Sequence, residues 1–265
     1  MRCLIRALAF TAAVAAAGCF QSTTLITVNG DGSGTIDQQV IFSGAALAQM
    51  RGLASLGGGK AFDPISEDQA RQAASSLGPN VRYVSSQPIA TGEGLGRAIV
   101  YAFTDINQLR LNEQPPAPGG VTIRSRQVNT EENSIRFALA PQPDGHIVLR
   151  ILLPQSAPAR ARRGATPTPP SPDDLATLKE TFAGARLSIA VKPAGTIVKT
   201  NSPWVDEGRV MLIDLDFDQI AADPAVLARL RGVASVDEAR SALSGVPGVK
   251  IPAASEVTIE FIRAK

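Results

Sequence analysis

Apolar and polar residues alternate most clearly near the start of the chain. Within Thr35–Phe42, the residues at every second position fall on one face, which predicts a strand packed against a core. The residues of that face are Ile36, Gln38, Val40 and Phe42. The apolar run Leu25–Val28 predicts a second strand, and the turn-forming residues Asn29–Gly34 separate the two. The pattern therefore predicts a β-hairpin.

Similar runs predict strands throughout the rest of the chain. They are Val81–Gln87, Arg97–Phe103, Val121–Val128, Ser134–Leu139, His146–Leu153, Ala185–Val191, Gly195–Lys199, Arg209–Leu215 and Glu256–Ile262. The spacing of apolar residues predicts helices over Gly44–Leu56, Ser66–Leu77, Asp173–Phe182, Asp218–Ala222, Pro224–Leu230 and Val236–Leu243. Ser66 and Gln69 have the spacing of a capping box. Because strands and helices do not alternate strictly, we predict an α+β fold with a largely antiparallel sheet.

The composition changes between residues 154 and 172, where prolines cluster around the run Arg160–Arg163. Such a segment predicts a mobile loop with no packed core. We therefore expect a single domain over 19–265 that carries this loop. The alternative is two domains, 23–153 and 173–265, divided at the loop.

The first residues form a pattern of their own. Arg2 and Arg6 are basic, Leu4–Ala17 is apolar, and small residues precede Cys19. The apolar run has about 14 residues, whereas a membrane-spanning helix needs roughly 20. This arrangement predicts a cleaved secretory signal over residues 1–18.

The small residues before Cys19 resemble the lipobox of bacterial lipoproteins. The resemblance implies lipidation of Cys19, cleavage before it and acylation, for example with palmitate, of the new amino group. It places the protein in the cell envelope, outside the cytoplasm. The sequence does not decide between the inner and the outer membrane, because Phe20 after Cys19 is no clear retention signal.

Composition narrows the functional classes. Of 26 Lys and Arg, Arg2 and Arg6 belong to the signal, and the remaining 24 balance 24 Asp and Glu. A neutral mature chain does not indicate nucleic acid as a partner. The two cysteines are Cys3, in the signal, and Cys19. No thiol is therefore left for a disulfide, for catalysis or for a cysteine-rich metal site.

Two acidic stretches resemble metal sites in part. Asn29–Asp37 has the oxygen side chains of an EF-hand loop, but Val40 stands where a bidentate Glu is needed. Asp214, Asp216 and Asp218 would share one face of a strand. We interpret the first as a hairpin turn and the second as a strand end with Asp218 capping the next helix. We expect no metal and no cofactor.

The chain shows no catalytic constellation. His146 is the sole histidine and follows a turn, and there is no Gly-x-Ser-x-Gly motif. The glycine-rich Gly92–Gly96 lacks the strand and helix of a dinucleotide site and predicts a flexible loop. We expect a protein that is not an enzyme. A hydrolase of unrecognised type is the remaining catalytic alternative.

Trp204 is the sole tryptophan and lies in a loop between predicted strands. A tryptophan in a loop covers the core, enters the headgroup region or stacks on a sugar. We name Trp204 as a speculative ligand-binding residue.

Beyond the signal, the chain resembles the LppM-type domain of bacterial lipoproteins. The resemblance rests on Cys19, the hairpin Leu25–Phe42, and the run from Gly184 to Asn201 that precedes a strand at Val210–Leu215. It implies an α+β binding domain with no catalytic residues.

The sequence thus predicts a lipid-anchored envelope protein whose domain binds a lipid, a glycan or a protein partner. The first strand is expected about four residues after Cys19, a tether of at most about 14 Å. The domain would then lie close to the bilayer. The alternative is a subunit of an envelope protein assembly.

Overall fold

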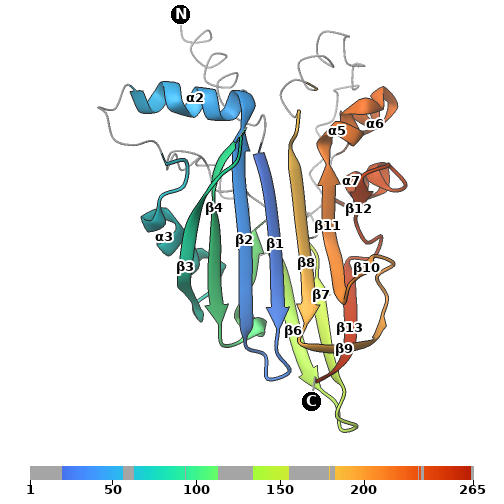
Figure 1. Cartoon of the computed structure of the whole chain (residues 1–265). Coiled ribbons are helices and arrows are strands. Elements are labelled where there is room, and N and C mark those ends of the chain that lie inside the picture. The colour runs from blue at the N-terminus through green and yellow to red at the C-terminus, as the bar shows by residue number, and fades with distance from the viewer. Residues whose placement is uncertain are drawn as a thin grey trace, which may run out of the picture.

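The computed structural model describes residues 20–55, 63–92, 94–112, 134–154, 179, 183–231, 233 and 236–263. Two β-sheets lie face to face, with short helices at their margins (Figure 1). The predicted signal 1–18, Cys19, the strand 121–128 and almost all of the loop and helix predicted over 154–182 lie outside the described residues.

The larger sheet has the strand order β10-β11-β8-β1-β2-β4-β3, with β12 paired to β11. Its strands are β1 (Phe20–Val28), β2 (Gly34–Ser43), β3 (Val81–Ala90), β4 (Gly94–Phe103), β8 (Arg186–Pro193), β10 (Val205–Asp206), β11 (Arg209–Asp216) and β12 (Val249–Lys250). The pair β1 and β8 is parallel and the other pairs are antiparallel. This sheet is therefore mixed.

The smaller sheet has the order β5-β6-β7-β13-β9 and is antiparallel throughout. Its strands are β5 (Arg110–Asn112), β6 (Ser134–Pro141), β7 (Ile147–Leu152), β9 (Gly195–Thr200) and β13 (Glu256–Arg263). The predicted α+β class holds in a coarse form. The described chain is β-rich, with a few short helices around a mixed and an antiparallel sheet.

The two sheets bury their inner faces against each other. Side chains at alternate positions of the strands point inward, as the period of two predicts. Fully buried members of this core include Ile26, Ile36, Tyr101, Ile135, Leu149 and Phe261. The phenol of Tyr101 donates a hydrogen bond to the carbonyl oxygen of Ala70 over 3.0 Å, and burial raises its pKa to about 12. Apolar burial at this interface holds the sheets together.

The helices lie at the margins of the sheets. They are α2 (Gly44–Ser55), α3 (Glu67–Leu77), the 3₁₀ turn η1 (Ile106–Gln108), α5 (Phe217–Ala222), α6 (Pro224–Arg231) and α7 (Val236–Leu243). Figure 1 shows α2 across the end of β2 and α3 beside β3. The predicted capping box at Ser66 and Gln69 is confirmed by both of its hydrogen bonds.

Each sheet takes strands from both sides of the segment 154–172. The larger sheet joins β1 to β8 and the smaller one joins β7 to β13. A division into 23–153 and 173–265 would therefore cut through both sheets.

Three local expectations need correction. The first strand begins at Phe20, well before the predicted Leu25. Gly94 and Gly96 belong to β4 and not to a flexible loop, because β2 passes so close that a Cβ on Gly96 would lie 1.9 Å from the carbonyl oxygen of Val40. The cap of α5 is Asp216, not Asp218.

Candidate functional site

The start of β1 fixes one end of the sandwich. Phe20 pairs with Phe42 of β2, which pairs with Leu95 of β4, while the next residue, Gln21, pairs with Arg186 of β8. We call this the proximal end. The opposite end holds the turns after β1 and β4, and we call it the distal end (Figure 1).

An ion pair at the proximal end links β8 to the helices that follow β11. Arg186 donates to Asp216 over 2.6 Å, and the carboxylate of Asp216 is largely buried. The same carboxylate accepts hydrogen bonds from the backbone N–H groups of Asp218 and Gln219, which caps α5. Asp216 thus joins two strands and a helix.

The other two aspartates of the predicted metal face are engaged separately. Asp214 pairs with Lys250 over 3.1 Å, and Asp218 accepts from the backbone N–H of Gly184 over 2.9 Å. Within the part of the chain that the structure describes, no three His, Cys, Asp or Glu side chains converge as metal ligands do.

The EF-hand-like stretch forms the turn between β1 and β2. Asp31 accepts hydrogen bonds from the hydroxyl and the backbone N–H of Ser33, and these bonds lower the pKa of Asp31. The carbonyl oxygen of Gly32 accepts from the N–H of Ile106. The carboxylate therefore stabilises the turn, as expected for a hairpin.

His146 lies at the distal end, before β7. Its Nδ1 lies 2.5 Å from Oε1 of Glu260 on β13 and 3.8 Å from a carboxylate oxygen of Asp144. The hydrogen bond to Glu260 is the main cause that raises the pKa of His146. The side chain is 31% exposed, so this pair ties β7 to β13 near the surface.

Trp204 lies between β9 and β10 and is 38% exposed. Its carbonyl oxygen accepts a hydrogen bond from the N–H of Met211. Met211 pairs with Ala190 of β8, and Ala190 pairs with Leu25 of β1, so Trp204 lies at the level of Leu25 in the larger sheet. Leu25 is five residues along β1 from Phe20, roughly 17 Å at the rise of a strand. Trp204 is therefore displaced from the proximal end. Its role in ligand binding stays a prediction.

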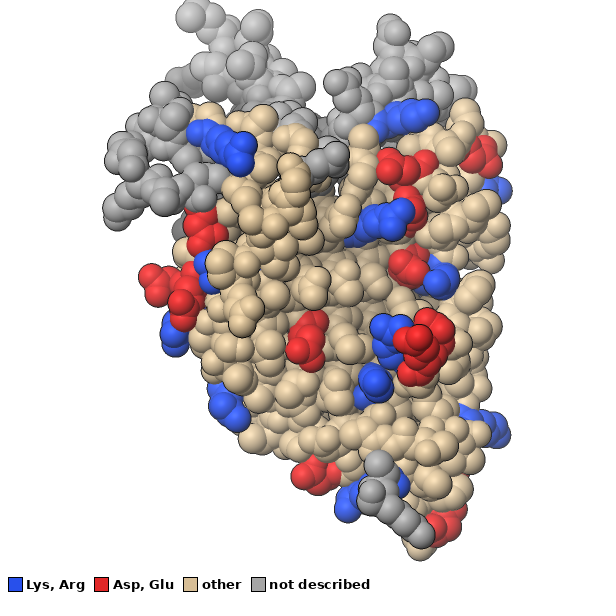
Figure 2. Space-filling view, in the orientation of Figure 1, with Lys and Arg blue, Asp and Glu red and all other residues tan. Residues whose placement is uncertain are grey.

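The outward face of the larger sheet carries few charges near its middle. Thr23, Thr27 and Gln39 are outward residues of β1 and β2, and Asp37 stands opposite Leu25. Figure 2 shows this face, with charged side chains of both signs at its margins and within the right half of the view. Among the described residues of this face, positive and negative side chains are mixed.

The helices α5, α6 and α7 form a cap that continues from the proximal end of β11. They bury a small apolar cluster of their own, formed by Ile220, Val226, Leu243, Val246 and Val249. The backbone N–H of Asp216 donates to the carbonyl oxygen of Gly248, which holds the cap against β11. We call residues 217–255 the helical cap.

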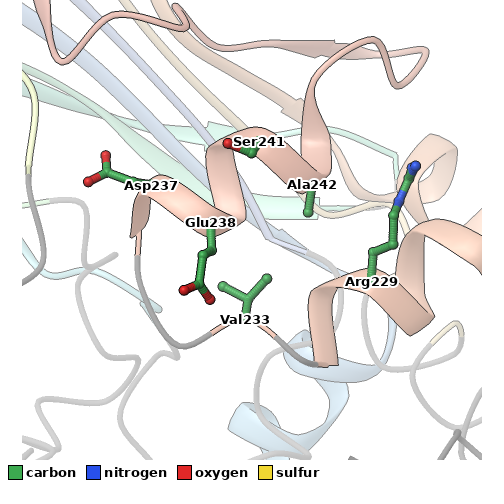
Figure 3. A pocket seen from close by; sticks show the side chains of 6 residues that line it. All are labelled: Arg229, Val233, Asp237, Glu238, Ser241 and Ala242. Atoms are coloured by element: carbon green, nitrogen blue, oxygen red, sulfur yellow. The ribbon is translucent and has the colours of Figure 1, made fainter. Parts of the chain in front are cut away.

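Two neighbouring pockets open on the helical cap. The first, of about 600 Å³, lies between α6 and α7 (Figure 3). Its lining residues are Arg229, Val233, Asp237, Glu238, Ser241 and Ala242. The second, of about 620 Å³, adjoins the first along α7, since Asp237 and Ser241 line both, and Arg240, Ser244 and Ser255 also line it. Neither pocket contains a residue predicted from the sequence to bind a ligand.

The sequence analysis also missed two buried arginines. Arg97 is 6% exposed and donates to the carbonyl oxygen of Ile65, to the hydroxyl of Ser86 and to Asp63. Arg240 is 8% exposed and donates to Asp237 and to the carbonyl oxygen of Pro154. The acceptors of Arg97, and one of the two acceptors of Arg240, are distant in sequence. No local sequence pattern therefore indicates that these arginines are buried.

Within the described residues, no helix combines the length and the apolar character needed to cross a bilayer.

No family model matches this sequence, and no curated protein sequence matches it. Among solved structures, the chain is similar to the NMR structure of the folded domain of LppM from Mycobacterium tuberculosis. That match has 8% identity and a TM-score of 0.34, and covers 94% of this chain and 92% of the other. A mutant M1 zinc metallopeptidase from Deinococcus radiodurans matches with 9% identity and a TM-score of 0.23, over 77% of this chain and 40% of that one. The LppM domain is thus a structural neighbour at low similarity.

Proposed function

We propose that this protein is a bacterial lipoprotein, anchored through Cys19, whose domain is held directly against the membrane surface. The observation that carries the proposal is the position of β1, which begins at Phe20, one residue after the lipobox cysteine. Adjacent Cα atoms are about 3.8 Å apart, so no spacer separates the lipid site from the folded sandwich.

A tether of this length would fix orientation as well as distance. Phe20 belongs to the proximal end together with Phe42 and Arg186. Lipidation at Cys19 would therefore turn the proximal end toward the bilayer and the distal end away from it. Two or more acyl chains would hold firmly, since each buried CH₂ contributes about 0.8 kcal/mol.

We further propose that the domain binds a partner and does not catalyse a reaction. The polar groups that the sequence singled out are used for structure. Asp216 caps a helix, Asp31 stabilises a turn and His146 ties β7 to β13. Because these three groups are engaged in structural contacts, we assign none of them a catalytic role.

The test is substitution of Cys19 in the native host. The proposal predicts that Cys19→Ala abolishes incorporation of labelled palmitate and releases the domain from the membrane fraction. Cys3→Ala, which lies within the predicted signal, is the matched control and should leave both unchanged. Acyl-labelled, membrane-retained Cys19→Ala protein would contradict the proposal.

A second candidate function is that of a subunit in an envelope protein assembly. Trp204 and Val205 are adjacent and 38% and 46% exposed, and they lie away from the proximal end. A protein partner that covered these two apolar side chains would remove them from water. A photocrosslinker at Val205 should capture one defined protein in the native envelope. A crosslinker that captures only lipid, or nothing, would contradict this candidate.

A further inference from the structure

Arg240, on α7, is a buried cation that the helical cap pairs incompletely. Its side chain is 8% exposed. One terminal nitrogen donates to Asp237 over 2.9 Å and the other to the carbonyl oxygen of Pro154 over 3.3 Å. Its Nε–H has no acceptor, and among the buried side-chain nitrogen and oxygen atoms of the described residues it is alone in this.

A guanidinium carries five N–H donors, so these two hydrogen bonds leave donors of Arg240 unused. A buried donor without an acceptor is costly, and a charged one more so. The structure therefore holds a buried cation with spare capacity for an acceptor.

The unused donors belong to a residue that lines a pocket. This is the second pocket described above, of about 620 Å³, which is a common size for a small-ligand site. Three serines, Ser241, Ser244 and Ser255, line it beside Arg240 and Asp237. One cation and three hydroxyl groups thus line one pocket, which is half open to solvent.

We propose that this pocket binds a phosphate group, with Arg240 as its cationic donor and the serine hydroxyls as further donors. The planar guanidinium fork matches the oxygens of phosphate, and such charge-assisted hydrogen bonds are stronger than neutral ones. A phosphate oxygen would accept from the N–H groups that the two hydrogen bonds leave unused on the terminal nitrogens of Arg240, because Nε itself is closed off from solvent.

Asp237 is the group that opposes an anion here. It pairs with Arg240 and lines the same pocket, but its side chain is 62% exposed. Water therefore solvates and screens this carboxylate, while the guanidinium is shielded. Removal of the Asp237 charge should strengthen phosphate binding, whereas removal of the Arg240 charge should weaken it.

The phosphate has two sources that share this chemistry, a phospholipid headgroup and a soluble phosphoester. The helical cap continues from the proximal end of β11 through Asp216. If the proposed anchoring through Cys19 is right, that end faces the bilayer, and a headgroup is the expected source. This assignment of the source rests on the proposed function, while the phosphate site itself does not.

The test is isothermal titration calorimetry of the full chain carrying Cys19→Ser, which has no acyl chain. The probes are inorganic phosphate and dihexanoyl phosphatidic acid below its micelle concentration, with dihexanoyl glycerol as the uncharged control. Binding of the lipid at least about tenfold tighter than phosphate assigns a headgroup. Equal binding assigns a soluble phosphoester and leaves the anchoring proposal to its own test at Cys19.

Variants decide whether the site is the one proposed. Arg240→Gln should weaken binding by at least about tenfold, and Asp237→Asn should tighten it. If Arg240→Gln does not fold, Ser244→Ala with Ser255→Ala keeps the cation and should still weaken binding. Arg229→Gln, which removes a cation from the neighbouring pocket, should change nothing.

Two results would overturn the proposal. One is the absence of binding heat with both phosphate probes. The other is binding that Asp237→Asn and the serine variants leave unchanged, or that Arg229→Gln weakens as much as Arg240→Gln does. The second result would mean that surface charge in general, and not this pocket, attracts the anion.

Discussion

Phe20, the first residue of β1, stands opposite Phe42 near the end of β2, so the chain is in the sheet as soon as it leaves Cys19. Any lipid on Cys19 would be attached to a rigid pair of strands. Partners of this protein would then meet a surface whose orientation to the membrane is set by strand pairing.

Gly96 tests the close pairing of β2 and β4. We expect Gly96→Ala to lower the free energy of unfolding by more than about 3 kcal/mol, because its methyl group would overlap the carbonyl oxygen of Val40. Urea unfolding measures the effect. Gly92→Ala is the matched control and should be near neutral, since no atom lies within 4 Å of its Cβ position. Equal effects for the two variants would contradict the pairing.

Loss of the capping box of α3 should lower the free energy of unfolding by a smaller amount. Ser66→Ala removes the acceptor of the Gln69 N–H and should cost about 1 kcal/mol, seen as a lower urea midpoint. Ser75→Ala, farther along the same helix, removes an exposed hydroxyl and should cost nothing, because alanine favours helices. A Ser66→Ala midpoint equal to that of the wild type would show that the box does not form in solution.

The pair His146 and Glu260 predicts a pH dependence. The hydrogen bond to Glu260 raises the pKa of His146 above the ordinary value of about 6.5 that the unfolded chain should have. A folded-state pKa that is raised stabilises the protein fully below about pH 6.5, and this stabilisation is lost as pH rises through the folded pKa. We therefore expect the stability of the wild type, relative to His146→Gln, to fall as the pH rises above about 6.5 and through the raised pKa of His146.

Urea midpoints of the two proteins, measured across this range, provide the check. Parallel pH curves for the wild type and His146→Gln would mean that the pair contributes nothing in solution.

Features governed by near neighbours could be predicted from the sequence. The hairpin turn with Asp31 and the capping box at Ser66 depend on residues within a few positions of each other, and both are present. The prediction of a flexible loop at Gly96 was wrong, because the sequence alone does not distinguish a glycine in a loop from a glycine that a neighbouring strand approaches closely. The strand β3 also continues to Ala90, past its predicted end at Gln87. It can include Pro88 because it is an edge strand, where a missing N–H is tolerated.

Features governed by distant partners could not be predicted. The parallel pair of β1 and β8 joins segments on opposite sides of 154–172. The short strands β10 and β12 exist because β11 offers them an edge. Likewise, Arg240 looks like any surface arginine of a helix in the sequence, but it is buried and one of its acceptors, the carbonyl oxygen of Pro154, lies 86 residues earlier. The candidate phosphate site therefore follows from tertiary packing.

Two fluorescent probes that flank β4 test most directly whether the proximal end faces the membrane. Gly92 and Thr104 are exposed and flank this ten-residue strand at its proximal and distal ends, and the strand between them is about 30 Å long at the rise of a strand. With Cys19 lipidated and Cys3 removed with the signal, Gly92→Cys or Thr104→Cys supplies a single thiol for a fluorophore. In vesicles with a headgroup-linked acceptor, we predict strong energy transfer from position 92 and weak transfer from position 104. Equal transfer from both, or stronger transfer from position 104, would contradict the account.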